Sequence, residues 1–433
     1  MLRFSQRTSS LRDVMVASDM CEAFVCLILQ GIIGICNAIL LVAGLAWCGV
    51  LPTAAGQGPV FNVVDFGARG DGITDDTEAF VRAWTAACGA RGSSATLLVP
   101  PFKSFLVGPT RFNGPCASAR TTVLVIGTIT AQPASAWAWA GKNYWLMFYQ
   151  VDGLTVTGNG GVLDGRGYTW WSNKCKDDTQ NCIPEAPTSL VLISCNNAEV
   201  SHLTSKDSPQ MHIAVITSRT VSVTQLTITA PGDSPNTDGV HIDRSENVQI
   251  TGSTIGTGDD CVSIGPGCRF VTVDGIVCGP GHGVSVGSLG KNGAMESVEH
   301  VDVRKVHFIN TMNGARIKTW PGGRGYAKSI SFTNINFTNV DNPVIIDQFY
   351  QDRGLPNMAA VALSNITYTY LQGTSRQKTA VDFDCSGIGS CTEIHVKYVA
   401  ITASDGRATE ARCRNAQGDT YGYVNPRIPC LIS

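Results

Sequence analysis

The sequence predicts an all-β protein, a parallel β-helix formed by one domain and closed at its N-terminal end by a short helix. Short runs of alternating apolar and polar residues are separated by glycine, asparagine, aspartate and serine. Only one segment beyond the N-terminal region has a convincing helical pattern. The runs recur at a loose spacing of 21 to 30 residues, beginning at Val200, Val221, Val248, Val271, Val301 and Ile330. Strands and turns repeated at this spacing are typical of coils that stack about 4.8 Å apart.

A β-sandwich or a β-propeller is the alternative fold for a chain of many short strands. Propeller blades need longer repeat units than those found here. Antiparallel hairpins would show two-residue turns, which are scarce in this sequence. The spacing therefore favours the β-helix.

Residues 1–55 are predicted to be an N-terminal tail followed by a signal peptide or signal anchor. Arginines precede a long apolar run, Ala23 to Leu51, and small residues follow it, with a plausible cleavage site after Ala55. The run is long for a signal peptide and long enough to span a bilayer, so cleavage and retention in a membrane both stay open. In either case we expect residues 56–433 to be exported as one β-helix domain.

Composition narrows the class of protein. Of the 433 residues, 15% are charged and 46 are glycine, which excludes a disordered chain or a coiled coil. The formal net charge of −2 gives no reason to expect nucleic acid as a partner. A polyanionic substrate is compatible with this charge, since a local basic patch would suffice to bind it. We expect a monomer.

A helix is predicted over residues 75–89. Asp75 and Glu78 have the spacing of a capping box, and Gly89 is a typical residue at a helix end. This helix would cover the open end of the first coil and protect its edge. One face of it carries Phe80, Trp84 and Cys88.

The cysteines indicate an oxidising compartment. Four of the 16 cysteines lie in or beside the N-terminal apolar run, which leaves twelve. Close pairs suggest local disulfides, although their connectivity stays open, and no CxxC or His/Cys cluster supports metal binding instead. Cys195 and Cys268 have no obvious partner. The expected pairs are Cys175–Cys182, Cys261–Cys278, Cys385–Cys391 and Cys413–Cys430.

Two asparagines, Asn336 and Asn365, begin Asn-X-Thr sequences that accept N-linked glycans in exported proteins. Each sequence is a weak signal alone. With the N-terminal region and the cysteines, they indicate a secreted glycoprotein.

Polar residues fall into register when successive coils are aligned on their apolar pairs. The aligned segments are Asp238–Ile242, Asp260–Ile264, His282–Val286 and Asn313–Lys318. Stacked strands would place Asp238, Asp260 and His282 roughly 5 Å apart, with Arg316 and Lys318 in the next coil. Because Gly258 lets the chain turn before the strand begins, Asp259 and Asp260 need not alternate, and both can face one outer cleft.

Each of these residues also has an ordinary structural explanation. Aspartate commonly occupies β-turns, and a histidine after a glycine is usually a turn residue. Three stacked acids, a histidine and two cations in register are harder to explain in this way, because like charges so close are destabilising unless they are used or neutralised. Two carboxyls whose pKa values are driven apart provide the acid and the base that glycoside hydrolysis needs.

At these residues the sequence resembles the plant-type polygalacturonases. The four signatures of that family are matched in order by SPNTDG (Ser234–Gly239), GDDC (Gly258–Cys261), CGPGHG (Cys278–Gly283) and RIKT (Arg316–Thr319). The plant-type pattern also appears in FNVVDFGARGDGITDDT, DGRGYTWW and GVSVGSLG. The resemblance covers Phe61 to about Cys430, and four motifs together are highly specific. It implies a right-handed parallel β-helix that hydrolyses polygalacturonate or pectin, outside the cell or in the cell wall, without a metal or other cofactor.

The resemblance also implies a role for each matched residue. Asp259 would be the general acid that protonates the glycosidic oxygen, and Asp238 and Asp260 would activate the water, giving hydrolysis with inversion. His282 would tune the protonation of the acid through the hydrogen-bond network. The expected substrate contacts are Arg316 and Lys318, which would grip the galacturonate carboxylate, with Lys318 at the rim of the cleft, and Tyr350 and Asn236.

Two departures from the family pattern concern cysteines. Plant-type members usually read QNYCD where this chain has Gln348 to Asp352, so one family disulfide is in doubt. A cysteine usually found near Ser218 is also absent, which leaves Cys195 without an obvious partner. Neither departure touches the four motifs, so they bear on stability or processing before activity.

Three other functions stay open. A pectate lyase is a β-helix whose clustered aspartates hold calcium, and its product is unsaturated; the histidine and the RIK motif favour the hydrolase. A rhamnogalacturonan or xylogalacturonan hydrolase would share the scaffold and part of the acid cluster. A catalytically silent wall-binding β-helix would need cations but not the intact acids. The sequence does not decide between internal cleavage and cleavage from the chain end.

Overall fold

The chain divides into two units, residues 1–57 and 58–433, and the elements below belong to the second. The computed structural model describes residues 58–137, 143–171, 186–351, 359–387 and 391–432. The N-terminal signal region and the expected pair Cys175–Cys182 lie outside these residues. Among the residues that are described, no helix is both long and apolar enough to cross a membrane.

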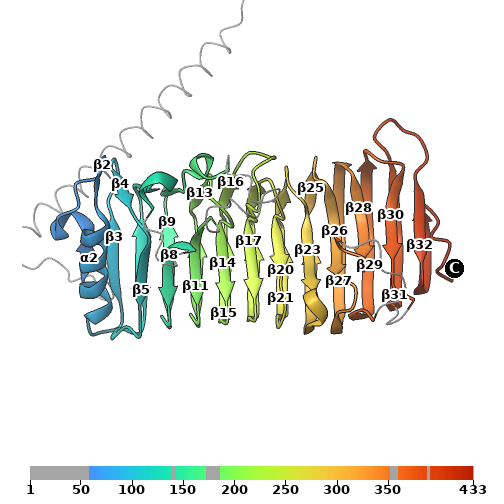
Figure 1. Ribbon diagram of the computed structural model, residues 1–433, viewed down its shortest axis with the longest axis horizontal. Helices are drawn as coiled ribbons and strands as arrows, with labels where there is room; N and C mark the ends of the chain where they lie inside the picture. The colour runs from blue at the N-terminus through green and yellow to red at the C-terminus, as the bar shows by residue number, and fades with distance from the viewer. Residues whose placement is uncertain (1–57, 138–142, 172–185, 352–358, 388–390, 433) are drawn as a thin grey trace, which may run out of the picture. The chain divides into compact units, whose positions relative to one another are not determined.

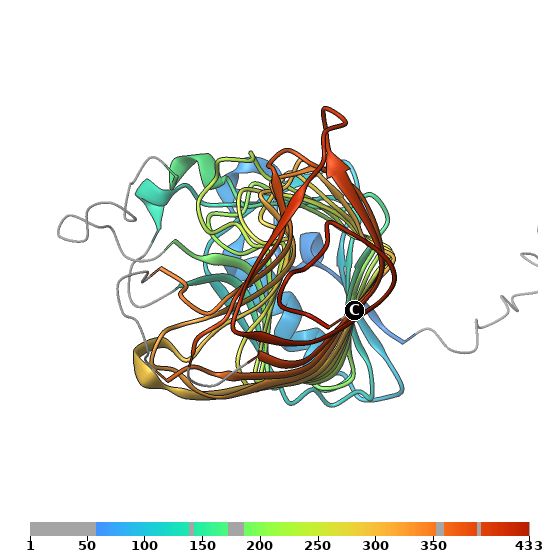
Figure 2. The ribbon, with the colours of Figure 1, turned by 90° about the vertical axis from the view of Figure 1, so that its right-hand side faces the viewer.

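The strands of residues 58–433 form coils that stack one after another from the N-terminal end to the C-terminal end (Figure 1). Strands pair in parallel with the equivalent strands of the coils before and after them, as β17 (Val240–Asp243) does with β14 (Ile213–Ile216) and β20 (Val262–Ile264). Seen along the stack, successive coils overlie one another (Figure 2). The predicted parallel β-helix is therefore confirmed.

One side of the coils between the first and the last belongs to an 11-stranded sheet. Its strands, in spatial order, are β5 (Thr110–Asn113), β8 (Tyr144–Tyr149), β11 (Thr188–Ile193), β14 (Ile213–Ile216), β17 (Val240–Asp243), β20 (Val262–Ile264), β23 (Val284–Leu289), β26 (Asn313–Thr319), β28 (Asn342–Asp347), β30 (Thr379–Asp384) and β32 (Glu410–Arg414).

The other sides form a 22-stranded sheet with two ladders, which merge where β27 pairs with both β24 and β25. The first ladder holds β1 (Val60–Asn62), β3 (Ala95–Val99), β6 (Thr121–Val125), β9 (Leu154–Gly158), β12 (Ala198–Ser201), β15 (Arg219–Thr224), β18 (Glu246–Thr251), β21 (Arg269–Asp274) and β24 (Met295–Arg304). The second holds β2 (Asp71–Asp75), β4 (Ser104–Val107), β7 (Thr128–Ala131), β10 (Val162–Asp164), β13 (Thr204–Lys206), β16 (Thr227–Thr229), β19 (Thr254–Gly256), β22 (Val277–Cys278) and β25 (His307–Ile309). The shared strands are β27 (Arg324–Val340), β29 (Ala362–Ser375), β31 (Cys391–Ala403) and β33 (Ala416–Asn425).

The core fills the inside of the coils with stacked apolar side chains. In the 11-stranded sheet, residues that pair across strands repeat the same kind of side chain, so valine or isoleucine lies on isoleucine in successive coils. One such buried row is Val215, Ile242, Ile264, Val286, Ile317 and Ile346. Because strand residues alternate between faces, the residues next to this row point to the outer face of the sheet.

The predicted helix is present as α2 (Thr77–Gly89) and packs on the first coils, with Phe80, Trp84 and Cys88 buried. Its predicted start is wrong by two residues, because Asp75 ends β2 and Asp76 is the N-cap residue. Asp76 instead accepts hydrogen bonds from backbone N–H groups of the preceding loop. Within the described residues there are also four short 3-10 helices: η1 (Val63–Phe66), η2 (Ala134–Ala136), η3 (Gly167–Thr169) and η4 (Lys291–Gly293).

Three of the expected disulfides are confirmed, and a fourth, Cys88–Cys116, was not expected from the sequence. Cys195 and Cys268, for which the sequence offered no obvious partner, are free, and both are buried. Ser218 lies beside Cys195 and accepts a hydrogen bond from its backbone N–H at 3.0 Å. The confirmed pairs are Cys261–Cys278, Cys385–Cys391 and Cys413–Cys430.

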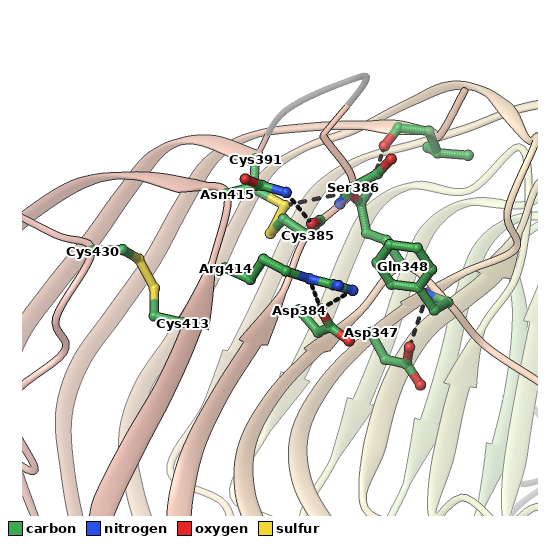
Figure 3. Close-up of a disulfide and its surroundings, with 12 residues drawn as sticks. Asp347, Gln348, Asp384, Cys385, Ser386, Cys391, Cys413, Arg414, Asn415 and Cys430 are labelled. Atoms are coloured by element: carbon green, nitrogen blue, oxygen red, sulfur yellow. Dashed lines mark hydrogen bonds and ion pairs between the residues drawn. A yellow bond between two sulfur atoms is a disulfide. The ribbon is translucent and has the colours of Figure 1, made fainter. Parts of the chain in front are cut away.

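Gln348 begins the segment in which the family cysteine is missing, and it connects three parts of the C-terminal coils (Figure 3). Its side chain is 1% exposed. Its amide donates to the carbonyl of Val361 at 2.7 Å and accepts from the N–H of Ser386 at 2.9 Å. Ser386 directly follows Cys385, within the segment that the Cys385–Cys391 disulfide closes, so Gln348 ties the end of β28 to that bridged segment.

Candidate active site

The residues predicted to cluster lie at equivalent places in neighbouring coils. The register pairs three valines across β17, β20 and β23: Val240, Val262 and Val284. Asp238, Asp260 and His282 each precede one of these valines by two residues. The alignment predicted from the sequence is therefore confirmed by the backbone pairing.

Two adjacent aspartates precede β20 rather than lie within it, so strand alternation does not separate them. Gly258 is needed there because a Cβ atom would meet the carbonyl oxygen of Ser234 at 2.0 Å. The N–H of Gly258 donates to Thr237 Oγ1 at 3.0 Å, which fixes this close approach. The two carboxylates end in different surroundings: Asp260 is 1% exposed, whereas 18% of the Asp259 side chain is exposed.

The Asp260 carboxylate is held by two cations and a hydroxyl. Arg316 Nη2 contacts Oδ1, Ser285 Oγ donates to Oδ1 at 2.8 Å, and Lys318 Nζ lies 2.9 Å from Oδ2. Burial alone would raise the pKa of Asp260, but the two cations outweigh it and lower the pKa to about 2. Asp260 is therefore ionised under ordinary conditions.

Asp238 has the opposite electrostatic environment. It is 8% exposed and accepts a hydrogen bond from Ser263 Oγ at 2.6 Å. Burial, and then the negative charges of Asp259 and Asp260, raise the pKa of Asp238. The two buried carboxyls, Asp238 and Asp260, thus have pKa values driven in opposite directions.

Asp259 is bound to His282. His282 Nδ1 lies 3.1 Å from Asp259 Oδ1, which also accepts the N–H of Asp260 at 2.8 Å. The backbone N–H of His282 donates to the carbonyl of Asp259 at 2.7 Å. These bonds fix the orientation of the Asp259 carboxylate, which is the most exposed of the three.

The structure places Lys318 on the floor of the site, with 7% exposure, and the predicted position at the rim is wrong. Lys318 is buried because it forms an ion pair with the buried Asp260. Lys318 Nζ also lies 5.2 Å from the centre of the Tyr350 ring, and that ring meets Trp320 edge to face at 5.4 Å. Tyr350 therefore lies beside the cluster, and Trp320 joins it.

Arg316 is likewise 8% exposed, and its Nε donates to Ser285 at 2.7 Å. Asn236, by contrast, is exposed in the turn before Asp238, where its backbone has a φ of 54°. Asparagine tolerates this left-handed conformation better than most residues. The structure thus brings seven of the eight predicted site residues together and places Asn236 in the adjoining turn.

The sequence analysis missed the side chains that support the acids. Ser263 and Ser285 each occupy an outer position of a strand, three residues after an acid or the histidine. His241 lies at the same register position one coil earlier. The period-two alternation of these strands could have identified them, but serine gives no chemical signal by itself.

Asp259, Asp260 and His282 could hold a cation in principle, since one donor atom from each lies within 4.8 Å of the others. Both Asp260 oxygens, however, already contact Arg316, Ser285 or Lys318. His282 Nδ1 faces Asp259. The chain thus supplies its own positive charge to this cluster.

A sequence profile of the glycosyl hydrolases family 28 matches residues 88–423. The chain belongs to that family. A probable polygalacturonase of Arabidopsis thaliana is 41% identical over 378 residues, covering 86% of this chain and 84% of the relative. A polygalacturonase of Malus domestica is 41% identical over 384 residues, covering 88% of this chain and 81% of the relative.

A solved structure is also similar to this chain. The endo-xylogalacturonan hydrolase of Aspergillus tubingensis aligns with a TM-score of 0.73 and 26% identity, over 84% of this chain and all of that chain (100%). The expected right-handed parallel β-helix of a family 28 glycoside hydrolase is therefore confirmed.

Proposed function

We propose that this family 28 enzyme hydrolyses the α-1,4-galacturonosyl linkages of polygalacturonate and pectin with inversion. The observation that carries the proposal is the Asp260 carboxylate, buried between Arg316 and Lys318, with Asp238 and Asp259 beside it. Relatives at 41% identity bear the name polygalacturonase. A cluster with two fixed cations suits a substrate that carries a carboxylate on each sugar.

In the proposed reaction, Asp259 is the general acid. Its partial exposure allows a substrate to approach, and its bonds with His282 and the Asp260 N–H orient it. The proton passes from Asp259 to the glycosidic oxygen as the bond to the anomeric carbon breaks. His282 tunes the protonation of Asp259 through their shared hydrogen bond.

Asp238 and Asp260 hold and activate the water that attacks the anomeric carbon. Asp260 stays ionised and orients the water, whereas the ionised form of Asp238 takes up the proton that the water loses. The raised pKa of Asp238 makes that form a stronger base than Asp260, and activity therefore requires Asp238 to be ionised. Arg316 and Lys318 would share their positive charge between Asp260 and the carboxylate of a bound galacturonate. Tyr350 and Asn236 would line the subsites that bind the sugars of the substrate.

A xylogalacturonan hydrolase is the second candidate, because that activity names a solved structure with the same fold. Its identity to this chain, 26%, is lower than the 41% of the plant polygalacturonases. We therefore favour polygalacturonate over xylogalacturonan as the proposed substrate.

The decisive experiment compares the products from polygalacturonate and from xylogalacturonan, each with and without a chelator. We expect reducing ends from polygalacturonate, no ultraviolet absorbance from an unsaturated uronide, and no effect of chelator. Proton NMR at early times should show the inverted anomer. An unsaturated product, or activity lost with chelator, would assign the chain to a lyase instead.

We further propose that residues 1–55 direct export and that the β-helix acts as a monomer outside the cell, in the cell wall. Contact with a membrane is expected only if the N-terminal apolar run stays uncleaved. The acceptor asparagines of the two glycan sequons, Asn336 and Asn365, are both exposed, which allows glycosylation. N-terminal sequencing of the protein recovered from the medium, and from membranes, tests both cleavage and location.

A further inference from the structure

A second row of side chains lies beside the acids on the outer face of the 11-stranded sheet. Backbone register places its members at equivalent positions of four successive coils: His241, Ser263, Ser285 and Arg316. Each serine donates to the carboxylate of the preceding coil, Ser263 to Asp238 at 2.6 Å and Ser285 to Asp260 at 2.8 Å. The two carboxyls therefore each accept a hydrogen bond from a serine of the following coil.

A serine hydroxyl has one proton, so a second group must determine where that proton points. For Ser285 this group is Arg316, whose Nε–H donates to Oγ at 2.7 Å. A guanidinium can only donate, so the Ser285 proton is always directed to Asp260. For Ser263 the corresponding group is His241, whose Nδ1 lies 2.8 Å from Oγ. His241 thus faces the Ser263 hydroxyl from the preceding coil, whereas Arg316 faces the Ser285 hydroxyl from the following coil.

We propose that His241 is a positioning residue of the hydrolysis: its Nδ1–H donates to Ser263, which directs the single hydroxyl proton of Ser263 to Asp238. The proposal rests on the function proposed above, in which Asp238 accepts the proton of the attacking water. A directed hydrogen bond from Ser263 favours the ionised Asp238, which is the form able to act as a base. His241 reaches the reaction through Ser263 and Asp238 and need not touch the substrate.

The charges around His241 agree with a neutral donor. Burial lowers the pKa of His241 to about 4, while Asp260 opposes the shift and Lys318 and Arg244 add to it. The imidazole is therefore uncharged near neutral pH, and it remains a donor at Nδ1 when it becomes protonated at low pH. Unlike Arg316, it supports the hydroxyl without adding a full positive charge beside the carboxyl. This difference fits the opposite pKa shifts of Asp238 and Asp260.

The test is the pH dependence of kcat/KM on polygalacturonate for four variants and the wild type. Loss of the Ser263 hydrogen bond removes a contact that lowers the pKa of Asp238. In His241→Ala and Ser263→Ala, the acidic limb of the profile should therefore move to higher pH, by about one unit. His241→Asn should return the acidic limb to its wild-type pH, because the N–H of the asparagine side chain lies close to the place of the histidine Nδ1.

The matched control is Ser205→Ala. Ser205 makes the same 2.8 Å bond to a histidine Nδ1, that of His212, but inside the core. His212 meets Asp238 through its backbone N–H, which donates to the Asp238 carbonyl at 2.8 Å, and its imidazole is not bonded to the Asp238 carboxyl. Removal of the Ser205 hydroxyl should lower the melting temperature without moving the limb. Circular dichroism of every variant separates a folding defect from an effect on the profile, and Ser263→Ala carries the test if His241→Ala does not fold.

Two results would overturn the proposal. One is an unchanged acidic limb in both folded alanine variants. The other is a uniform loss at every pH that His241→Asn does not rescue, which would mean a purely structural role. A second readout needs no activity: ¹⁵N shifts of the histidines, with the signal of His241 identified by its loss in His241→Asn, should show the Nδ1–H tautomer in the wild type. Failure of the wild type to cleave polygalacturonate would refute the proposed function, not this hydrogen-bond chain.

Discussion

Lys318 and Asp260 form a buried ion pair, with Nζ 2.9 Å from Oδ2, and neither side chain is more than 9% exposed. A surface lysine would contribute little to stability or to chemistry. In a buried pair, removal of one partner leaves an uncompensated charge, so the pair affects both the stability of the protein and the chemistry of the site. The lysine that was expected to contact only the substrate thus supports Asp260, the carboxylate proposed to orient the water.

Replacement of Lys318 by methionine should lower kcat/KM on polygalacturonate by about ten- to hundred-fold, the value of one charge-assisted hydrogen bond. Since the ammonium also holds Asp260, part of this loss should persist on highly methyl-esterified pectin, where the uronate charge is absent. Kinetics on both substrates separate the two contributions. Lys328→Met, which removes an exposed lysine paired with Glu299, is the control. Equal losses on both substrates would mean that Lys318 acts through Asp260 alone.

Asp259→Asn should reduce kcat by on the order of 10²–10⁴, because an amide cannot supply the proton that the leaving oxygen needs. The fold should remain, since the asparagine oxygen can still accept the N–H of Asp260. Substrate affinity measured by calorimetry should change little. Asp274→Asn, which removes an acid paired with Arg304 on the other sheet, should leave kcat unchanged. Near wild-type turnover of Asp259→Asn would remove this residue from the role of acid.

Asp238→Asn should stabilise the protein while it abolishes most activity. Because the pKa of Asp238 is raised, the folded chain keeps a proton that the unfolded chain loses above about pH 4, so stability falls as pH rises from there toward the folded pKa. Asp238→Asn has no carboxyl to ionise at this position, so its stability does not fall in this way as pH rises. Its melting temperature should exceed that of the wild type at pH 7, by on the order of 2 °C, and by less at pH 5.

Asp260→Asn provides the control of opposite sign. The pKa of Asp260 is lowered, so its ionised form adds stability above about pH 4 that is lost as pH falls toward 2. This variant should be less stable than the wild type at neutral pH. Thermal scans from pH 3 to pH 8 compare the two directly. A constant difference across this range for Asp238→Asn would contradict the assigned pKa direction.

Gln348→Ala should destabilise the C-terminal coils by about 1–3 kcal/mol, because it leaves the buried carbonyl of Val361 and N–H of Ser386 without this amide (Figure 3). Gln348→Glu should not rescue the loss, since an ionised carboxylate cannot donate to the carbonyl. Urea unfolding measures the change. Gln372→Ala, which removes an exposed amide bonded to Asn336, should cost far less. Comparable effects of the two substitutions would show that the Gln348 bonds do not support this region.

Much of the fold and the cluster could be predicted because the chain repeats. The spacing of apolar runs predicts the coils, and the same register places Asp238, Asp260 and His282 side by side. The Cys88–Cys116 bridge was missed because it joins the unrepeated helix to a loop. The depth of Lys318 could not be predicted, since burial depends on which carboxylate it meets across coils. His241 was missed because its contact is a serine hydroxyl of the next coil, and serine gives no chemical signal by itself.

The coil that leads from His282 to Asn313 is longer than the coil before it and contains both η4 and the long strand β24. Nevertheless, Val284 pairs with Ala315 in the same manner as Val262 pairs with Val284. Most of the extra residues lie outside the 11-stranded sheet, and those within it follow Val286, where the register of β23 with β26 shifts. Such a chain can therefore acquire or lose loop residues during evolution, and so change which polysaccharide it admits, while the reacting groups stay in place. A deletion of one residue within β20 would have the opposite effect, since it would turn every outward side chain of that strand toward the core.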